Sequence, residues 1–189
     1  MEDIKSILKF IVGFMPWILF LFISGHTLVS LERAIIVCLL ASVLFGYKGL
    51  RKRFILNWGT LAYFMICLVM VNFMKNMFVI KNMSIFSNGF LAAIIWFTIF
   101  SGKPFTLQYA REELSKEKWN NPSLIRGCHF MAMVWGFLLT FSVIVSCFKA
   151  FNPGVFPEKI YFDINLVTIA GGIMFTHLYK KIKKKRAEN

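Results

Sequence analysis

The feature that most constrains this sequence is a series of six apolar runs, each about as long as a helix that crosses a lipid bilayer. About 20 helical residues span the hydrocarbon core of a membrane. The runs are continuous rather than alternating, which favours helices over a membrane β-barrel. They cover residues 7–25, 31–47, 54–73, 84–102, 123–148 and 160–179. The sequence therefore predicts one all-α, polytopic membrane domain over residues 1–189 with six transmembrane helices.

The charged residues are too few for a soluble protein and are placed as in membrane proteins. Only 16% of the residues are charged, whereas soluble domains carry about 25%. The net charge of +13 comes from Lys and Arg in short connections and in the basic tail 180–189. This placement favours contact with anionic lipid headgroups over binding of nucleic acid. We expect membrane lipids as partners, together with other inner-membrane proteins, and no nucleic acid.

The same charges predict an orientation. The second connection, the fourth connection and the tail carry four, five and six Lys or Arg, whereas the three odd-numbered connections share five. Positive residues are retained on the cytoplasmic side. The sequence therefore predicts a multi-pass protein of a bacterial-type inner membrane with both termini in the cytoplasm.

The first run has an alternative interpretation. Pro16 lies in the middle of the run, and Lys5 and Lys9 flank its start. A proline removes a backbone donor and kinks a helix. Five spans with an interfacial or re-entrant first segment would follow. We prefer six spans, because two cytoplasmic termini require an even number.

The polar loop 103–122, within "SGKPFTLQYAREELSKEKWNNP", predicts a short amphipathic helix on the cytoplasmic face. Gly102 and Pro104 would end the preceding helix, while Asn121 and Pro122 have the residue types that begin the next one. Aromatic residues here suit headgroup depth, although a solvated linker helix is the alternative. The candidate residues for interfacial or partner contact are Lys103, Pro104, Phe105, Tyr109, Arg111, Trp119 and Arg126.

Few polar groups lie inside the apolar runs. The candidates are Asn72, Asn88, His129, Asp163 and Asn165. We interpret them first as structural: asparagines joining helices, a packed or headgroup-facing histidine, and an aspartate capping the last helix. The small residues "AGG" at 170–172 would allow close approach of two helices. A small transporter or lipid-handling protein would instead bring the polar groups to one cavity.

No motif for an enzyme, metal or cofactor is evident. The sequence has no P-loop, HExxH pair or nucleophile elbow, and the spacing of its four cysteines matches no zinc site. We therefore name no catalytic, metal or cofactor-binding residue and expect no cofactor.

Several local features occur in the order typical of one known family. They are "KFIVGFMPWILF", a basic second connection, "SGKPF", Trp119 in the polar stretch, "MAMVWGFLLTF" with Trp135, and the basic tail. In this order the chain resembles the bacterial intracellular septation protein A family of inner-membrane proteins. It departs from that pattern at "GCHFMAMVW" and "KIYFDIN". The resemblance implies a non-enzymatic protein that supports envelope integrity or septum formation through protein and lipid contacts.

Overall fold

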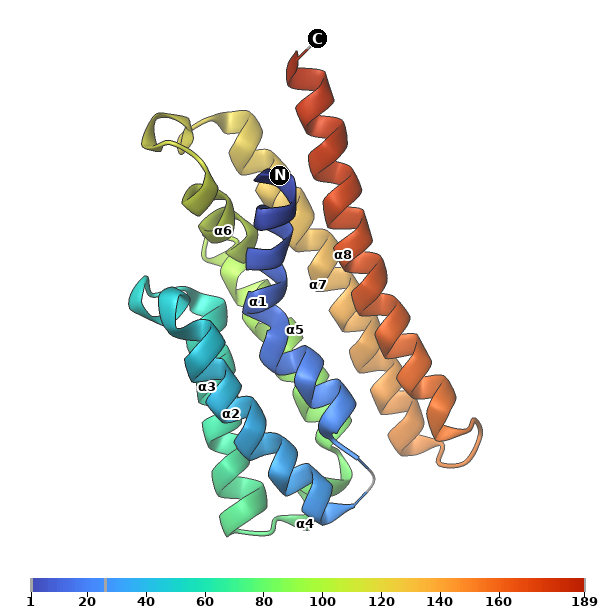
Figure 1. The fold of residues 1–189 in the computed structure, drawn as a ribbon. Helices are drawn as coiled ribbons and strands as arrows, with labels where there is room; N and C mark the ends of the chain where they lie inside the picture. The colour runs from blue at the N-terminus through green and yellow to red at the C-terminus, as the bar shows by residue number, and fades with distance from the viewer. Residues whose placement is uncertain (1, 26, 189) are drawn as a thin grey trace.

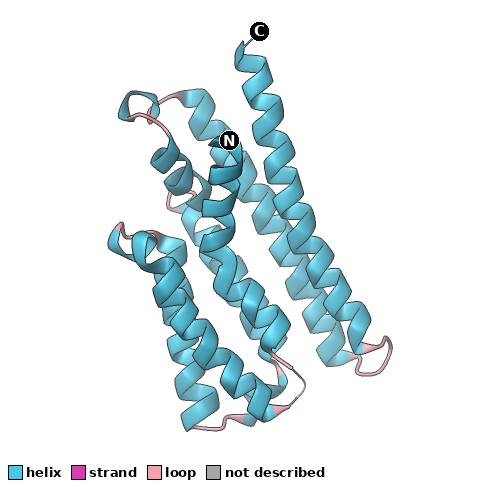
Figure 2. Cartoon of the chain, in the orientation of Figure 1, coloured by secondary structure: helices cyan, strands magenta, loops and turns pink. Residues whose placement is uncertain are grey.

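The computed structural model describes residues 2–25 and 27–188, with side chains placed for 12–25, 27–112, 114–117 and 119–183. Within these ranges the regular structure is entirely helical, joined by short loops and turns (Figure 2). The predicted all-α membrane fold is confirmed.

Six long helical segments form the bundle. They are α1 Glu2–Ile23, α2 Leu28–Arg51, α3 Ile55–Cys67 with a π-helical extension Leu68–Phe73, α5 Met83–Phe100, α7 Pro122–Phe151 and α8 Glu158–Glu188. The short elements are α4 Met77–Lys81, α6 Phe105–Glu113 and a 3₁₀ turn Lys116–Lys118. Successive long helices run in opposite directions, so both termini lie at one end of the bundle (Figure 1). We call this the proximal end, and the opposite end, near α4 and the α7–α8 turn, the distal end.

Five of these segments are long and apolar enough to cross a membrane. They are Leu28–Arg51, Ile55–Phe73, Met83–Phe100, Pro122–Phe151 and Glu158–Lys183. The apolar part of α1, Val12–Ile23, is shorter. Each of the last five predicted runs thus corresponds to one observed span.

The first run forms one continuous helix that does not reverse direction. Pro16 lies inside α1 and is buried. Phe14, Trp17 and Phe20 belong to the buried core. The first segment is thus one helix packed in the core, its apolar part is shorter than the five spans, and the choice between five and six spans stays a prediction.

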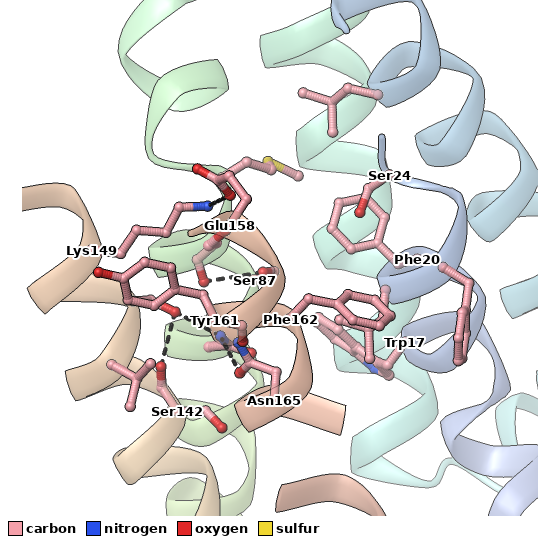
Figure 3. A pocket seen from close by; sticks show the side chains of 18 of the residues that line it. Trp17, Phe20, Ser24, Ser87, Ser142, Lys149, Glu158, Tyr161, Phe162 and Asn165 are labelled. Atoms are coloured by element: carbon pink, nitrogen blue, oxygen red, sulfur yellow. Dashed lines mark hydrogen bonds and ion pairs between the residues drawn. The ribbon is translucent and has the colours of Figure 1, made fainter. Parts of the chain in front are cut away.

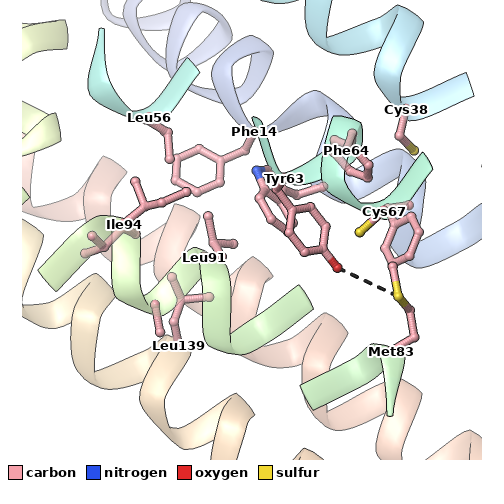
Figure 4. Close-up of a cluster of buried hydrophobic side chains, with 14 of the residues drawn as sticks. Phe14, Cys38, Leu56, Tyr63, Phe64, Cys67, Met83, Leu91, Ile94 and Leu139 are labelled. Atoms are coloured by element: carbon pink, nitrogen blue, oxygen red, sulfur yellow. Dashed lines mark hydrogen bonds between the residues drawn. The ribbon is translucent and has the colours of Figure 1, made fainter. Parts of the chain in front are cut away.

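Aromatic side chains of α1 and α3 meet in the core (Figure 4), and a further ring contact joins α1 to α7. The rings of Trp17 and Tyr63 stack with centroids 4.9 Å apart, and those of Phe14 and Trp135 with centroids 5.2 Å apart. The Trp17 indole also donates a hydrogen bond of 2.9 Å to Thr60 Oγ1. Because lipid is as apolar as these side chains, close packing and hydrogen bonds hold such helices together.

The polar segment between α5 and α7 begins and ends as predicted. Gly102 follows α5 with a φ of +68°, a conformation that glycine adopts without strain. Pro122 is the first residue of α7, and Asn121 Oδ1 accepts a 2.8 Å hydrogen bond from the Ser123 backbone N–H. These contacts satisfy backbone groups that would otherwise have no partner at the helix ends.

Between these points, α6 packs into the protein rather than lying on its surface. Phe105 is 0% exposed, and its ring meets Phe14 edge-on with centroids 5.8 Å apart. Thr106 Oγ1 donates a 2.6 Å hydrogen bond to the Cys128 carbonyl of α7. Tyr109 donates through its hydroxyl to Asn57 Oδ1 of α3, at 3.1 Å. These contacts fix α6 to three long helices.

Candidate functional site

A cavity of about 800 Å³ opens between the helices at the distal end. Residues from α1, α2, α4, α5, α7 and α8 line it, and we call it the distal cavity. Sites for small ligands in proteins are typically about 300–1,000 Å³. The distal cavity is therefore large enough for a small molecule or part of a lipid.

One wall of the distal cavity is polar. Asn88 Nδ2, on α5, donates to Ser146 Oγ of α7 at 2.9 Å and to Asn165 Oδ1 of α8 at 3.3 Å. Asn165 Nδ2 in turn donates to the Tyr161 carbonyl at 2.9 Å. Ser142 lines the wall one helical turn from Ser146. Amides and hydroxyls of three different helices thus meet on one side of the cavity (Figure 3).

The chain pattern explains why these groups share a wall. Residues four apart lie on the same face of a helix. Ser142 and Ser146 on α7, and Tyr161 and Asn165 on α8, have this spacing. Asn88 uses its amide nitrogen in both of these bonds, and its Oδ1 acceptor has no hydrogen-bond partner among the described residues. This oxygen is available to a donor on a ligand.

The facing wall is aromatic. Trp17, Phe20 and Phe22 of α1 line it together with Phe162 of α8. Figure 3 shows Trp17, Phe20 and Phe162 grouped opposite Ser142 and the nearby polar side chains. The rings of Phe22 and Phe162 meet edge-on with centroids 5.8 Å apart. The cavity therefore has one apolar side and one hydrogen-bonding side.

Charged side chains surround the distal cavity near the α7–α8 turn. Lys149 and Glu158 form an ion pair there, and the Lys149 ammonium lies 5.6 Å from the centre of the Tyr161 ring. Lys81 and Lys159 also line the cavity and are exposed. Three lysines and one glutamate leave two positive charges in excess. The rim is therefore suited to an anionic group.

Tyr161 carries an unsatisfied polar atom beside this rim. The residue is only 6% exposed, and its buried hydroxyl has no hydrogen-bond partner among the described residues. An unpaired buried hydroxyl costs about 1–3 kcal/mol. This hydroxyl could therefore still form a hydrogen bond to a polar group beside it.

Two of the five predicted intramembrane polar residues come together here, Asn88 and Asn165. The cavity lining includes neither Asn72, nor His129, nor Asp163. Asn72 instead donates to the Glu32 carbonyl at 3.3 Å, and its buried Oδ1 has no described partner. His129 is half-buried on α7. Of the five predicted residues, Asn88 of α5 and Asn165 of α8 are therefore the two that meet at the distal cavity.

The predicted cap by Asp163 is wrong. Helix α8 begins at Glu158, five residues earlier, so Asp163 lies in its second turn and is exposed. The tight loop after α7 lets α8 start before the apolar run does.

The predicted contact surface in the polar loop is corrected in part. Pro104 and Phe105 are buried and unavailable to a partner, because α6 packs into the bundle. Tyr109 is half-buried and bonded to Asn57. Burial raises the pKa of the Tyr109 hydroxyl well above its usual value, so it remains a protonated donor.

The other four candidates of this surface lie closer to solvent. Lys103 and Arg126 are exposed. Arg111 and Trp119 are half-buried against each other. The Trp119 indole donates to the Arg111 carbonyl at 3.0 Å, and the guanidinium lies 5.7 Å from the indole centre. The contacts of this pair thus join α6 to the segment just after the 3₁₀ turn.

Most of the distal cavity was not predicted from the sequence. Ser142 and Ser146 had a usable signal, since two serines four residues apart in an apolar run mark a polar stripe on one helix face. No sequence signal identified the contacts of Lys149 with Glu158 and Tyr161, because these contacts depend on the path of the chain between α7 and α8.

The described residues include no group of three His, Cys, Asp or Glu side chains placed to hold a metal ion. Comparisons with protein-family models, with curated proteins and with solved structures found no match to this chain. The resemblance to the septation protein A family therefore stays a prediction, and the chemistry of the distal cavity is the basis for a function.

Proposed function

We propose that this protein is a lipid-handling membrane protein that binds an anionic amphiphile in the distal cavity. The observation that carries the proposal is the Asn88–Asn165 pair, which lies between an aromatic wall and a lysine-rich rim. With both termini in the cytoplasm of a bacterial-type cell, the cavity opens on the outer side of the inner membrane.

The polar wall supports a ligand with hydrogen-bonding groups. Amide and hydroxyl groups at membrane depth are costly unless they are paired. Asn88, Asn165 and Ser146 bond with one another but line an open cavity instead of closing it. A ligand that donates to Asn88 Oδ1 would satisfy the acceptor that the protein leaves open.

The other two parts of the cavity support an amphiphile in particular. The aromatic wall formed by Trp17, Phe20 and Phe162 suits a hydrocarbon chain. The excess lysines at the rim suit a phosphate or carboxylate, which forms strong charge-assisted hydrogen bonds. A molecule with a chain, a hydroxylated linker and an anionic head matches all three surfaces.

The proposal is tested by photolabelling in vesicles. The probe is phosphatidylglycerol with a diazirine on one acyl chain, and labelled peptides are identified by mass spectrometry. We expect preferential labelling within residues 12–25 and 158–169, which border the cavity. Asn88→Leu with Asn165→Leu keeps the volume but removes the amides, and should reduce this labelling about tenfold.

Asn72→Leu is the matched control, because Asn72 is an asparagine of the same membrane region that does not line the cavity. It should label as the wild type does. A phosphatidylcholine probe with the same chain should label less. Labelling spread evenly over exposed residues such as Leu40 and Leu44, or unchanged by the double substitution, would overturn the proposal.

A further inference from the structure

A second, smaller cleft lies at the proximal end between α6, α7 and α8. Its volume is about 290 Å³, and we call it the proximal cleft. It shares no lining residue with the distal cavity. Any ligand here is therefore independent of the function proposed above.

The interior of the proximal cleft is mainly apolar. Ala110, Leu124 and Met131 contribute side chains from α6 and α7. The lining residue Thr176 already has a partner, since its hydroxyl accepts a 3.1 Å hydrogen bond from the Trp135 indole. Such a surface suits hydrocarbon and offers little to a polar ligand.

Two lysines of α8, Lys180 and Lys183, line the same cleft. Lys183 Nζ donates to the Ser123 carbonyl at the start of α7, at 2.5 Å, and so holds its charge beside the cleft. Gly127 leaves the room for this, since a Cβ at that position would collide with Lys183 Nζ. None of the described lining residues is acidic. The cleft therefore combines an apolar interior with two lysines along one side.

We infer that the proximal cleft binds one anionic phospholipid of the surrounding bilayer. The phosphate lies against Lys180 and Lys183, and part of an acyl chain lies along Leu124 and Met131. Lysines at the ends of spanning helices reach headgroup level, and basic pockets between such helices favour anionic lipids. Two of its three walls, α7 and α8, are helices long and apolar enough to span the membrane, which would bring a bilayer lipid within reach of the cleft.

Native mass spectrometry of the full chain tests the inference. The protein is released from detergent micelles that contain phosphatidylglycerol or phosphatidylcholine with identical acyl chains. In the Asn88→Leu/Asn165→Leu background, which lacks the amides of the distal cavity, we expect one retained phosphatidylglycerol that survives at higher activation energy than any phosphatidylcholine. Lys180→Gln with Lys183→Gln should weaken this binding about 25-fold, at roughly fivefold for each lysine.

The matched control is Lys48→Gln with Lys181→Gln, which removes the same charge from exposed lysines of the proximal end that do not line the cleft. It should retain the lipid, as should Lys180→Arg with Lys183→Arg. Equal loss in the glutamine control would mean a diffuse charge effect and would overturn the inference, as would unchanged binding in the Lys180/Lys183 glutamine variant.

A separate variant tests the contact between the acyl chain and the apolar interior of the proximal cleft. Ala110→Phe fills the cleft and leaves both lysines in place, so it should also lose the lipid while eluting as a folded protein in size-exclusion chromatography. Full retention in this variant, or displacement of the lipid by millimolar glycerol phosphate, would show a headgroup contact only and would contradict the inferred site. The Asn88/Asn165 variant should keep this lipid, which separates the two sites.

Discussion

At the residue scale, one close contact between α7 and α8 forms where a large ring meets a residue without a side chain. Trp135 on α7 stacks on Phe14 and donates to Thr176. Its ring also lies over Gly172 of α8, where a Cβ would come within 2.9 Å of the indole. The predicted close approach at "AGG" is therefore found at Gly172 but not at its neighbour Gly171, where a Cβ would meet nothing within 4 Å.

This difference predicts opposite effects for two adjacent substitutions. Gly172→Ala forces the Trp135 ring to move, and overpacking of this kind costs about 1–3 kcal/mol. Gly171→Ala has space and gains up to about 1 kcal/mol from helix propensity. Thermal unfolding in detergent, followed by intrinsic fluorescence, should place the melting temperature of the Gly172 variant below that of the Gly171 variant. Equal melting temperatures would mean that α7 and α8 do not pack closely at this point.

At the element scale, α6 is the segment for which sequence and structure differ most. The stretch was predicted to be a short helix, and Phe105–Glu113 forms one. The amphipathic pattern does identify part of the buried side, since Leu107 is buried, whereas Phe105, expected at headgroup depth, is buried as well. A pattern of apolar residues does not, however, distinguish a side that faces headgroups from a side that packs on other helices. The Thr106 and Tyr109 bonds to α7 and α3 decide this, and both are contacts between distant parts of the chain.

The packed position of α6 predicts a large effect of truncating Phe105. Phe105→Ala leaves a cavity against Phe14 and should destabilise the protein by about 3–5 kcal/mol. The control is Phe100→Ala, five residues earlier and 81% exposed at the end of α5, which should change the stability by less than about 1 kcal/mol. Both are measured by thermal unfolding in the same detergent. If the Phe105 variant were as stable as the Phe100 variant, α6 would not be held inside the bundle.

At the scale of the whole molecule, the features set by long runs of sequence were predictable. The apolar runs located five spans and the core of α1, because hydrophobic length is a property of neighbouring residues. The distal cavity was predictable only in part. Asn88 and Asn165 stand out as polar groups in apolar runs, but their meeting with Ser146, and the meeting of Lys149 with Glu158, require the register of α5, α7 and α8. A role in septum formation remains a prediction.

The orientation of the whole molecule is the last prediction, and it decides which leaflet each cavity meets. Both termini lie at the proximal end (Figure 1), as an even number of spans requires, and the positive-inside rule places that end in the cytoplasm. Reporter fusions after Lys103 and after Asn189 should therefore both report cytoplasm, whereas an insertion at Gly154, in the distal α7–α8 turn, should report the opposite side. Opposite results at Lys103 and Asn189 would contradict the six-span arrangement. If all three reporters gave the opposite side, the fold would be unchanged but the protein would be inverted in the membrane. The proximal cleft would then bind its anionic lipid from the outer leaflet.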